Sequence, residues 1–174
     1  MLRNFTATAK NDAPRVLYEN EYVQVLDRDG YYYWHEKQNL GVALLVYRGN
    51  GFEFLGRFEL NPAHSTELEA CSITGKIDGG ETARLAAIRE LKEETGYQCG
   101  SKDLEELGLF YPFKSSDYRL HGFAIDVSGQ RRGKAKGDGS KAEEKANCKW
   151  LSRKELLQSN DAIVGALVAR WLLG

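Results

Sequence analysis

Short runs in which apolar and polar residues alternate fill the first part of the chain, and alternation with a period of two indicates β-strands. Val16 to Tyr18, Glu21 to Asp27 and Tyr31 to His35 show this pattern. Asp29-Gly30 separates the second run from the third and is a favoured hairpin turn. Because consecutive strands joined by short turns pair with one another, we expect an N-terminal antiparallel β-meander within residues 1–38.

A second, more apolar group of strands follows. Gly41 to Tyr47 is almost continuously apolar, which is typical of a strand buried on both faces. The turn Arg48-Gly49-Asn50-Gly51 leads from it into Phe52 to Phe58. Four later runs have the same strand-like character: Thr66 to Ile73, Leu104 to Phe113, Tyr118 to Val127 and Asn147 to Leu151. Together these runs predict a larger sheet.

The helical period of 3.6 residues appears between Thr82 and Thr95. Leu85, Ile88 and Leu91 fall on one side of such a helix, and Gly96 follows it as a suitable C-cap. We expect the side that carries these three apolar residues to dock on the sheet.

Two more helices are expected near the end of the sequence. Ser152 and Glu155 have the spacing of a capping box, and Asp161 is a suitable N-cap for a helix that runs to Leu172. Strands interleaved with helices predict an α/β fold with a mixed sheet and helices on its sides. We divide the chain into an N-terminal extension, 1–38, and one domain, 39–174.

The composition excludes several classes of protein. Hydrophobic residues make up 42% and charged residues 28%, and the formal net charge of −1 argues against a nucleic-acid partner. Cys71, Cys99 and Cys148 form no CxxC pair, so neither a disulfide framework nor a zinc site is supported. The sequence has no signal-peptide core and no run near the roughly 20 apolar residues of a membrane span. We therefore expect a cytoplasmic protein with no membrane partner.

Three glutamates give the predicted helix its chemistry. Glu90, Glu93 and Glu94 stand at i, i+3 and i+4, so their carboxylates share one face and repel one another unless a cation lies among them. A hard divalent cation, Mg²⁺ or Mn²⁺, is the simplest partner. Small residues between the glutamates are expected to leave room for a ligand: Ala83, Ala86 and Ala87. The alternative interpretation is a solvated helix with surface glutamates.

The glutamates belong to a longer pattern. It comprises Gly75, five residues, Glu81, seven residues, Arg89-Glu90-Leu91, one residue, Glu93-Glu94, one residue, Gly96 and Tyr97. This segment resembles the Nudix box, with Tyr97 where an aliphatic residue is more common. The resemblance implies the α/β/α sandwich of the Nudix family and a divalent metal, usually Mg²⁺. It also implies hydrolysis of a nucleoside diphosphate linked to another group.

The box suggests a role for each of its polar residues. All three helix glutamates are candidate metal ligands, and Thr74, directly before the box, is a further one. Glu81 lies about two and a half turns before Glu90, so it reaches a metal only through water or instead holds the loop. Arg89 is expected to clamp Glu81 or the loop, because a guanidinium pairs bidentately with a carboxylate.

Segments that flank the box resemble the ADP-ribose pyrophosphatase branch of the family. These are LYENEYVQVLDRDG, the proline Pro112 and NDAIVGALVARWLL. In that branch the N-terminal meander takes part in a homodimer and aromatic residues hold the adenine. Tyr33, Trp34 and Pro112 are therefore candidate substrate-binding residues. The competing interpretation of Tyr31 to Trp34 is an ordinary strand that alternates between core and interface.

The same resemblance suggests a catalytic base and a phosphate ligand. The branch takes its base from an acidic loop before the last strand, where this chain has Glu143 and Glu144. Glu93 is the competing base because it stands on the box helix. Arg57 matches the first arginine of the branch's Arg-Gln-Tyr-Arg, although Phe58 replaces the glutamine.

The favoured substrate is a small nucleotide, ADP-ribose or another nucleotide sugar, cleaved to a nucleoside monophosphate and a phosphorylated sugar. Two departures from the branch leave the choice open. Ser72-Ile73-Thr74 stands where the branch has Leu-Pro-Ala, and Phe113 stands where a glycine commonly follows the proline. The alternatives are a hydrolase of non-standard nucleoside triphosphates and a non-catalytic ADP-ribose sensor, which typically lacks box glutamates.

Overall fold

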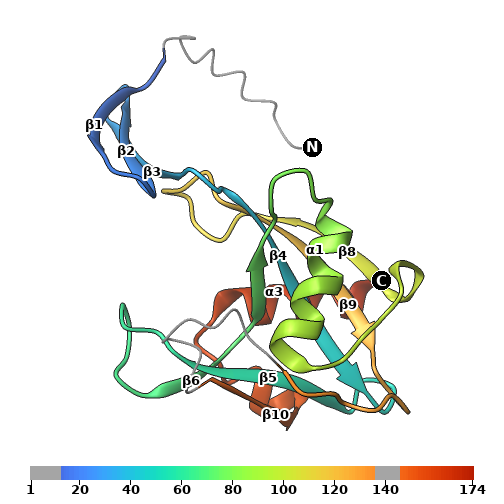
Figure 1. Cartoon of the computed structure of the whole chain (residues 1–174). Coiled ribbons are helices and arrows are strands. Elements are labelled where there is room, and N and C mark those ends of the chain that lie inside the picture. The colour runs from blue at the N-terminus through green and yellow to red at the C-terminus, as the bar shows by residue number, and fades with distance from the viewer. Residues whose placement is uncertain (1–12, 136–145) are drawn as a thin grey trace, which may run out of the picture.

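Two separate sheets hold the strands in a computed structural model, which describes residues 13–135 and 146–174 (Figure 1). The smaller sheet is the antiparallel meander β1-β2-β3, formed by Arg15–Glu19, Val23–Arg28 and Tyr31–Glu36. Asp29 and Gly30 turn β2 into β3 with φ of 54° and 84°, the left-handed values that this hairpin requires. The structure confirms the expected meander.

The larger sheet is mixed. It contains β4 (Leu40–Arg48), β5 (Glu53–Leu60), β6 (Leu68–Cys71), β7 (Ile73–Lys76), β8 (Glu105–Phe110), β9 (Arg119–Asp126) and β10 (Asn147–Ser152). The strand order is β10-β5-β4-β9-β8, with β6 beside β5 and β7 beside β4. β4 and β9 run parallel and the other pairs are antiparallel. The apolar run in β4 is buried at the centre, as its sequence predicted.

The predicted strand Thr66 to Ile73 is in fact two strands, divided at Ser72. β4 and β5 pair only at Tyr47↔Phe54 and Arg48↔Glu53 and then diverge, so β6 follows β5 while β7 follows β4. We call the region where β4 and β5 diverge, together with β6 and β7 that pair with them there, the strand fork. The N–H and hydroxyl of Ser72 both donate to Oδ2 of Asp161, at 2.7 and 2.5 Å, and replace the ladder bonds lost at the division.

Helices cover both faces of the larger sheet, as Figure 1 shows. α1 (Ala83–Glu90) continues as the π-helical η1 (Leu91–Thr95) on one face, and α3 (Ala162–Leu173) packs on the other. Side chains of β4 alternate between the two cores: Val42, Leu44 and Val46 face α1, and Ala43 and Leu45 face α3. The short helices η2 (Ser101–Asp103) and α2 (Arg153–Leu156) complete this α/β/α sandwich, which confirms the expected fold class.

The helix ends follow their sequence signals. Ser152 and Glu155 form the predicted capping box, Asp161 accepts from the N–H of Ile163 at 2.9 Å, and Gly96 ends η1 with φ of 79°. None of the helices in the described ranges is both long and apolar enough to cross a membrane.

Two of the three apolar residues expected to dock on the sheet do so: Leu91 is buried in the core and Ile88 packs against it. Leu85 is 54% exposed, whereas Ala86, Ala87 and Leu91 are completely buried. Small side chains allow the helix to approach the sheet closely, so Ala86 and Ala87 share the contact with Leu91. The expectation that the alanines leave room for a ligand is wrong, because they pack in the core.

Candidate active site

An acidic cleft of about 600 Å³ lies between the box helix and the edge of β7. Its carboxylate lining comes from Asp78, Glu90, Glu93 and Glu94, and Arg89 is the guanidinium among them. The cleft therefore brings the three predicted helix glutamates to one place.

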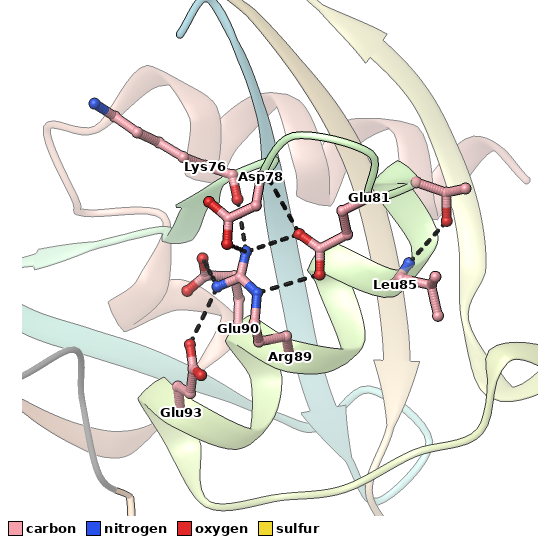
Figure 2. Close-up of polar contacts among 8 residues, drawn as sticks. Lys76, Asp78, Glu81, Leu85, Arg89, Glu90 and Glu93 are labelled. Carbon is pink, nitrogen blue, oxygen red and sulfur yellow. Dashed lines mark hydrogen bonds and ion pairs between the residues drawn. The ribbon is translucent and has the colours of Figure 1, made fainter.

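Arg89 is the hub of this arrangement (Figure 2). Its Nε and Nη2 donate to the two carboxylate oxygens of Glu81 at 3.2 and 3.0 Å. Its Nη1 donates to Glu90 at 2.7 Å and to Glu93 at 3.1 Å, while Nη2 also reaches the carbonyl of Lys76 at 2.8 Å. These bonds, led by those to Glu81, raise the pKa of Arg89. The structure thus confirms Arg89 as a clamp between the glutamates and the loop.

The loop before α1 presents Glu81 to that clamp. The N–H of Glu81 donates to the carbonyl of Asp78 at 3.0 Å, and the N–H of Asp78 donates back to the Glu81 carboxylate at 3.2 Å. Thr82 then caps α1 by accepting from the N–H of Leu85. The hydrogen bonds from Arg89 hold the pKa of Glu81 below its usual range. Glu81 consequently remains a loop-holding anion, one of the two roles expected for it.

Glu90 is buried against the backbone of Gly75. A Cβ at position 75 would stand 1.8 Å from Cδ of Glu90, so only glycine leaves space for this carboxylate. Glu90 is 8% exposed, and burial raises its pKa despite the hydrogen bond from Arg89. This carboxyl group is therefore held desolvated at the floor of the cleft.

The box helix runs to Thr95 as expected, but its C-terminal turn, Leu91–Thr95, is π-helical. The Thr95 hydroxyl donates to the carbonyl of Leu91, which competes with the regular helical bonds. The last two glutamates of the box differ in exposure. The Glu93 side chain is 36% exposed, whereas that of Glu94 is 6% exposed.

Arg57 is the partner of Glu94. Both are buried, and Nη1 of Arg57 forms an ion pair with Oε2 of Glu94. Nε of Arg57 donates to Glu59 at 2.7 Å. The structure therefore places Arg57 between two carboxylates beside the cleft, and its contact with substrate phosphate stays a prediction.

The donor set of the cleft suits a hard divalent cation. Glu90, Glu93 and Glu94 supply carboxylate oxygens, and Thr74 lines the cleft beside them. Over residues 13–135 and 146–174, no three His, Cys, Asp or Glu side chains already surround one metal position. Arg89 binds one oxygen each of Glu90 and Glu93, and Arg57 binds one oxygen of Glu94, so the second oxygen of each carboxylate could face an ion.

A second cavity, of about 330 Å³, adjoins the cleft. Thr74 and Tyr118 line both spaces. The second cavity is also lined by Pro112 and Phe113 and by Asp161 at the start of α3. Its mixed apolar and polar wall differs from the acidic cleft and suits an organic group.

Tyr118 is a residue of both spaces that the sequence reading passed over. Its hydroxyl and the carbonyl oxygen of Gly75 lie 2.3 and 2.7 Å from the point where a Cβ of Gly41 would stand. Burial raises the pKa of Tyr118 to about 12, so the phenol keeps its proton and can donate a hydrogen bond. Nothing in the sequence around Tyr118 indicates that its side chain lines these two spaces.

The other predicted site residues lie in three places. Pro112 lines the second cavity, as a substrate-binding role requires. Tyr33 and Trp34 stand on β3, with the Trp34 ring 5.6 Å from that of Phe113 and the Tyr33 ring 6.4 Å from that of Tyr31. Glu143 and Glu144 lie outside the described residues.

Two sequence relatives cover part of the chain. "Putative nudix hydrolase 2" of Caenorhabditis elegans is 47% identical over 55 residues, 32% of this chain and 25% of that protein. "Putative 8-oxo-dGTP diphosphatase" of Bacillus subtilis (strain 168) is 37% identical over 78 residues, 45% of this chain and 46% of that protein. The alignments thus span a quarter and just under half of the length of these relatives.

A solved structure shares the fold over nearly the whole length. The crystal structure of an ADP compounds hydrolase matches 94% of this chain and 96% of its own, with a TM-score of 0.64 and 18% identity. At this identity the likeness concerns the fold alone. The model of the NUDIX domain matches residues 37–172, which include the whole glycine- and glutamate-bearing box. The chain therefore belongs to the Nudix family.

Proposed function

We propose that this chain hydrolyses the pyrophosphate of a nucleoside diphosphate linked to another moiety, with ADP-ribose or another nucleotide sugar as the favoured substrate. The observation that carries this proposal is the acidic cleft joined to a cavity of mixed lining through Thr74 and Tyr118. A pyrophosphate with an organic group attached matches the two adjoining spaces. The products would be a nucleoside monophosphate and a phosphorylated sugar.

The cofactor in this proposal is Mg²⁺, with Mn²⁺ as a substitute. Glu90, Glu93 and Glu94 would hold it, and Glu81 and Thr74 are further candidates. When bound, a divalent ion neutralises the diphosphate and lowers the pKa of a coordinated water. Arg89 keeps the glutamates in one place through its hydrogen bonds at 2.7–3.2 Å.

Glu93 is the described carboxylate best suited to take a proton from water. Its side chain is 36% exposed, against 10% for Glu90 and 6% for Glu94, so it meets solvent at the mouth of the cleft. A carboxylate that is accessible to water can act as a general base. Glu143 and Glu144 stay predicted alternatives for this role.

A Glu93→Gln variant tests the chemistry. We expect kcat to fall by roughly 10²-fold or more, the range of general-base contributions, while Tm stays near that of the wild type. Glu105→Gln, on an exposed position of β8, is the matched control and should keep full activity. Near-normal turnover by Glu93→Gln would remove Glu93 from the mechanism.

The Bacillus subtilis relative supports a second candidate, the hydrolysis of a nucleoside triphosphate. Product analysis separates the two, because a triphosphate would release inorganic pyrophosphate and a nucleotide sugar would release two organic phosphates. The experiment is a panel of ADP-ribose, other nucleotide sugars, dinucleotides and nucleoside triphosphates assayed with Mg²⁺ and Mn²⁺. Tight binding of ADP-ribose without turnover of any compound would instead indicate a sensor.

The homodimer implied by the branch resemblance is part of the same proposal. The meander exposes large apolar side chains: Val16, Leu17, Tyr18, Tyr22, Tyr31 and Tyr32. Light scattering measures the mass in solution, and a monomer at the concentrations used for assay would remove the dimer from the proposal.

A further inference from the structure

The N-terminal meander contacts residues 111–118, the stretch of chain that links β8 to β9. The N–H of Trp34 donates to the carbonyl of Ser115 at 2.9 Å, and the hydroxyl of Tyr31 donates to that of Lys114 at 2.6 Å. The rings of Trp34 and Phe113 lie 5.6 Å apart. The meander and the larger sheet share no strand pairing among the described residues, so these contacts are a principal link between them.

A group of polar contacts lies at the end of the same stretch, and we call this group of His35, Asn39 and Asp117 the joint. Nδ1 of His35 and Oδ2 of Asp117 are 2.6 Å apart, and because a carboxylate only accepts, the histidine nitrogen carries the hydrogen. Nδ2 of Asn39 donates to the same oxygen at 3.1 Å. The other oxygen of Asp117 is buried, with no hydrogen-bond partner in the described part of the chain. One oxygen of Asp117 is therefore held by His35 and Asn39 together, and the loss of His35 would leave Asn39 as the described donor to it.

The opposite side of this stretch faces the substrate spaces. Pro112 and Phe113 line the second cavity, and Tyr118 lines both that cavity and the acidic cleft. Asp117 directly precedes Tyr118, whose N–H donates to the hydroxyl of the buried Ser116 at 3.0 Å. A shift of the stretch away from β3 would thus move one wall of the site.

We propose that His35 and Asp117 are positioning residues, which hold residues 111–118 on the meander and so keep Phe113 and Tyr118 in place for the organic part of the substrate. The predicted effect on substrate affinity rests on the proposed function. The contact between His35 and Asp117 rests on the geometry alone. β3 then has an indirect role: Trp34 and His35 act through residues 111–118. The meander thereby sets substrate affinity and leaves the hydrolytic step to the box.

The test compares His35→Ala, His35→Asn and Asp117→Ala in the full chain. Asparagine places an amide donor where Nδ1 of histidine stood, so His35→Asn should keep the joint. Arg15→Ala is the matched control, because it removes the 2.7 Å meander ion pair to Asp27 and touches no residue of 111–118. Hydrogen exchange by mass spectrometry reports on the stretch, and kinetics with ADP-ribose reports on the site.

We expect faster exchange of residues 111–118 in His35→Ala and Asp117→Ala, with unchanged exchange in 83–95. KM for ADP-ribose should rise roughly tenfold, the effect of losing one hydrogen bond to a charged group, while kcat stays within about threefold. The dissociation constant of AMP should rise in parallel. His35→Asn and Arg15→Ala should resemble the wild type in all of these measurements.

Unchanged exchange of 111–118 in both alanine variants would overturn the joint itself. Faster exchange with an unchanged KM and unchanged AMP affinity would overturn the positioning role, as would a fall in kcat alone. If no nucleotide is hydrolysed or bound, the proposed function fails, and the exchange data still decide whether His35 and Asp117 hold the stretch.

Discussion

Gly75→Ala isolates the effect of moving one carboxylate. The new Cβ would stand 1.8 Å from Cδ and 1.9 Å from Oε1 of Glu90. Carbon contacts need about 3.5 Å, so the end of the Glu90 side chain must shift by about 1.5 Å or more. A displacement of about 1 Å in a reacting site costs roughly 10²-fold in rate, which corresponds to about 2.7 kcal/mol in the activation barrier.

The assay measures kcat on the best compound of the substrate panel, together with Tm. Because the overlapping atoms belong to the far end of a flexible side chain, we expect the variant to stay folded with a small change in Tm. Gly79→Ala is the matched control, since its Cβ would meet nothing within 4 Å. If Gly75→Ala keeps more than about a third of wild-type kcat, the position of the Glu90 carboxylate does not determine the rate and this prediction is wrong.

Three further predictions concern stability and reactivity. Leu91→Ala, at a fully buried position of the box helix, should lower the free energy of unfolding in urea by about 2–5 kcal/mol, whereas Leu85→Ala, at an exposed one, should change it by less than about 0.5 kcal/mol. Burial raises the pKa of Glu90 above 4.5, so this group favours the folded state least at neutral pH and more as pH falls through the raised pKa. Glu90→Gln should therefore raise Tm at pH 7 in EDTA and abolish most activity, and a lower Tm there, or a gain that grows toward pH 4.5, would contradict this account. Burial also raises the pKa of Cys71 and Cys99 to about 11, which leaves about a hundredfold fewer thiolates at pH 8 than an ordinary cysteine has. Iodoacetamide should modify both cysteines slowly in the native protein and quickly in urea. Equal rates in the two conditions would contradict the raised pKa.

Most strands and caps followed from local chemistry. The apolar run of β4, the Asp29-Gly30 turn and the Ser152 capping box each depend on residues next to one another, so the sequence pattern was sufficient to predict them. The expectation that Arg89 clamps Glu81 or the loop followed from the bidentate pairing of a guanidinium with a carboxylate. These features need no knowledge of the tertiary fold.

The features that escaped prediction depend on distant residues. Of the three apolar residues expected to face the core, Leu85 alone was misassigned, because it looks like a core residue until the close packing of Ala86 and Ala87 on the sheet is known. The π-turn at Thr95 and the burial of Glu94 against Arg57 likewise depend on packing. His35 and Asp117 are 82 residues apart, and nothing in either neighbourhood indicates the pair.

The strand fork bears on the order in which this protein folds. Ser72 is held by Asp161, a residue 89 positions later in the chain, and closure of so long a loop is slow. The Ser72 contact can therefore form only once Asp161, at the start of α3, has reached the sheet. Because Thr74 lines both the cleft and the second cavity, we expect the two spaces to form together, late in folding. Stopped-flow refolding can check the order in a variant with Trp34→Phe and Trp150→Phe, in which Trp171 of α3, packed against Tyr47, is the remaining tryptophan. Its fluorescence should change before or together with the return of activity.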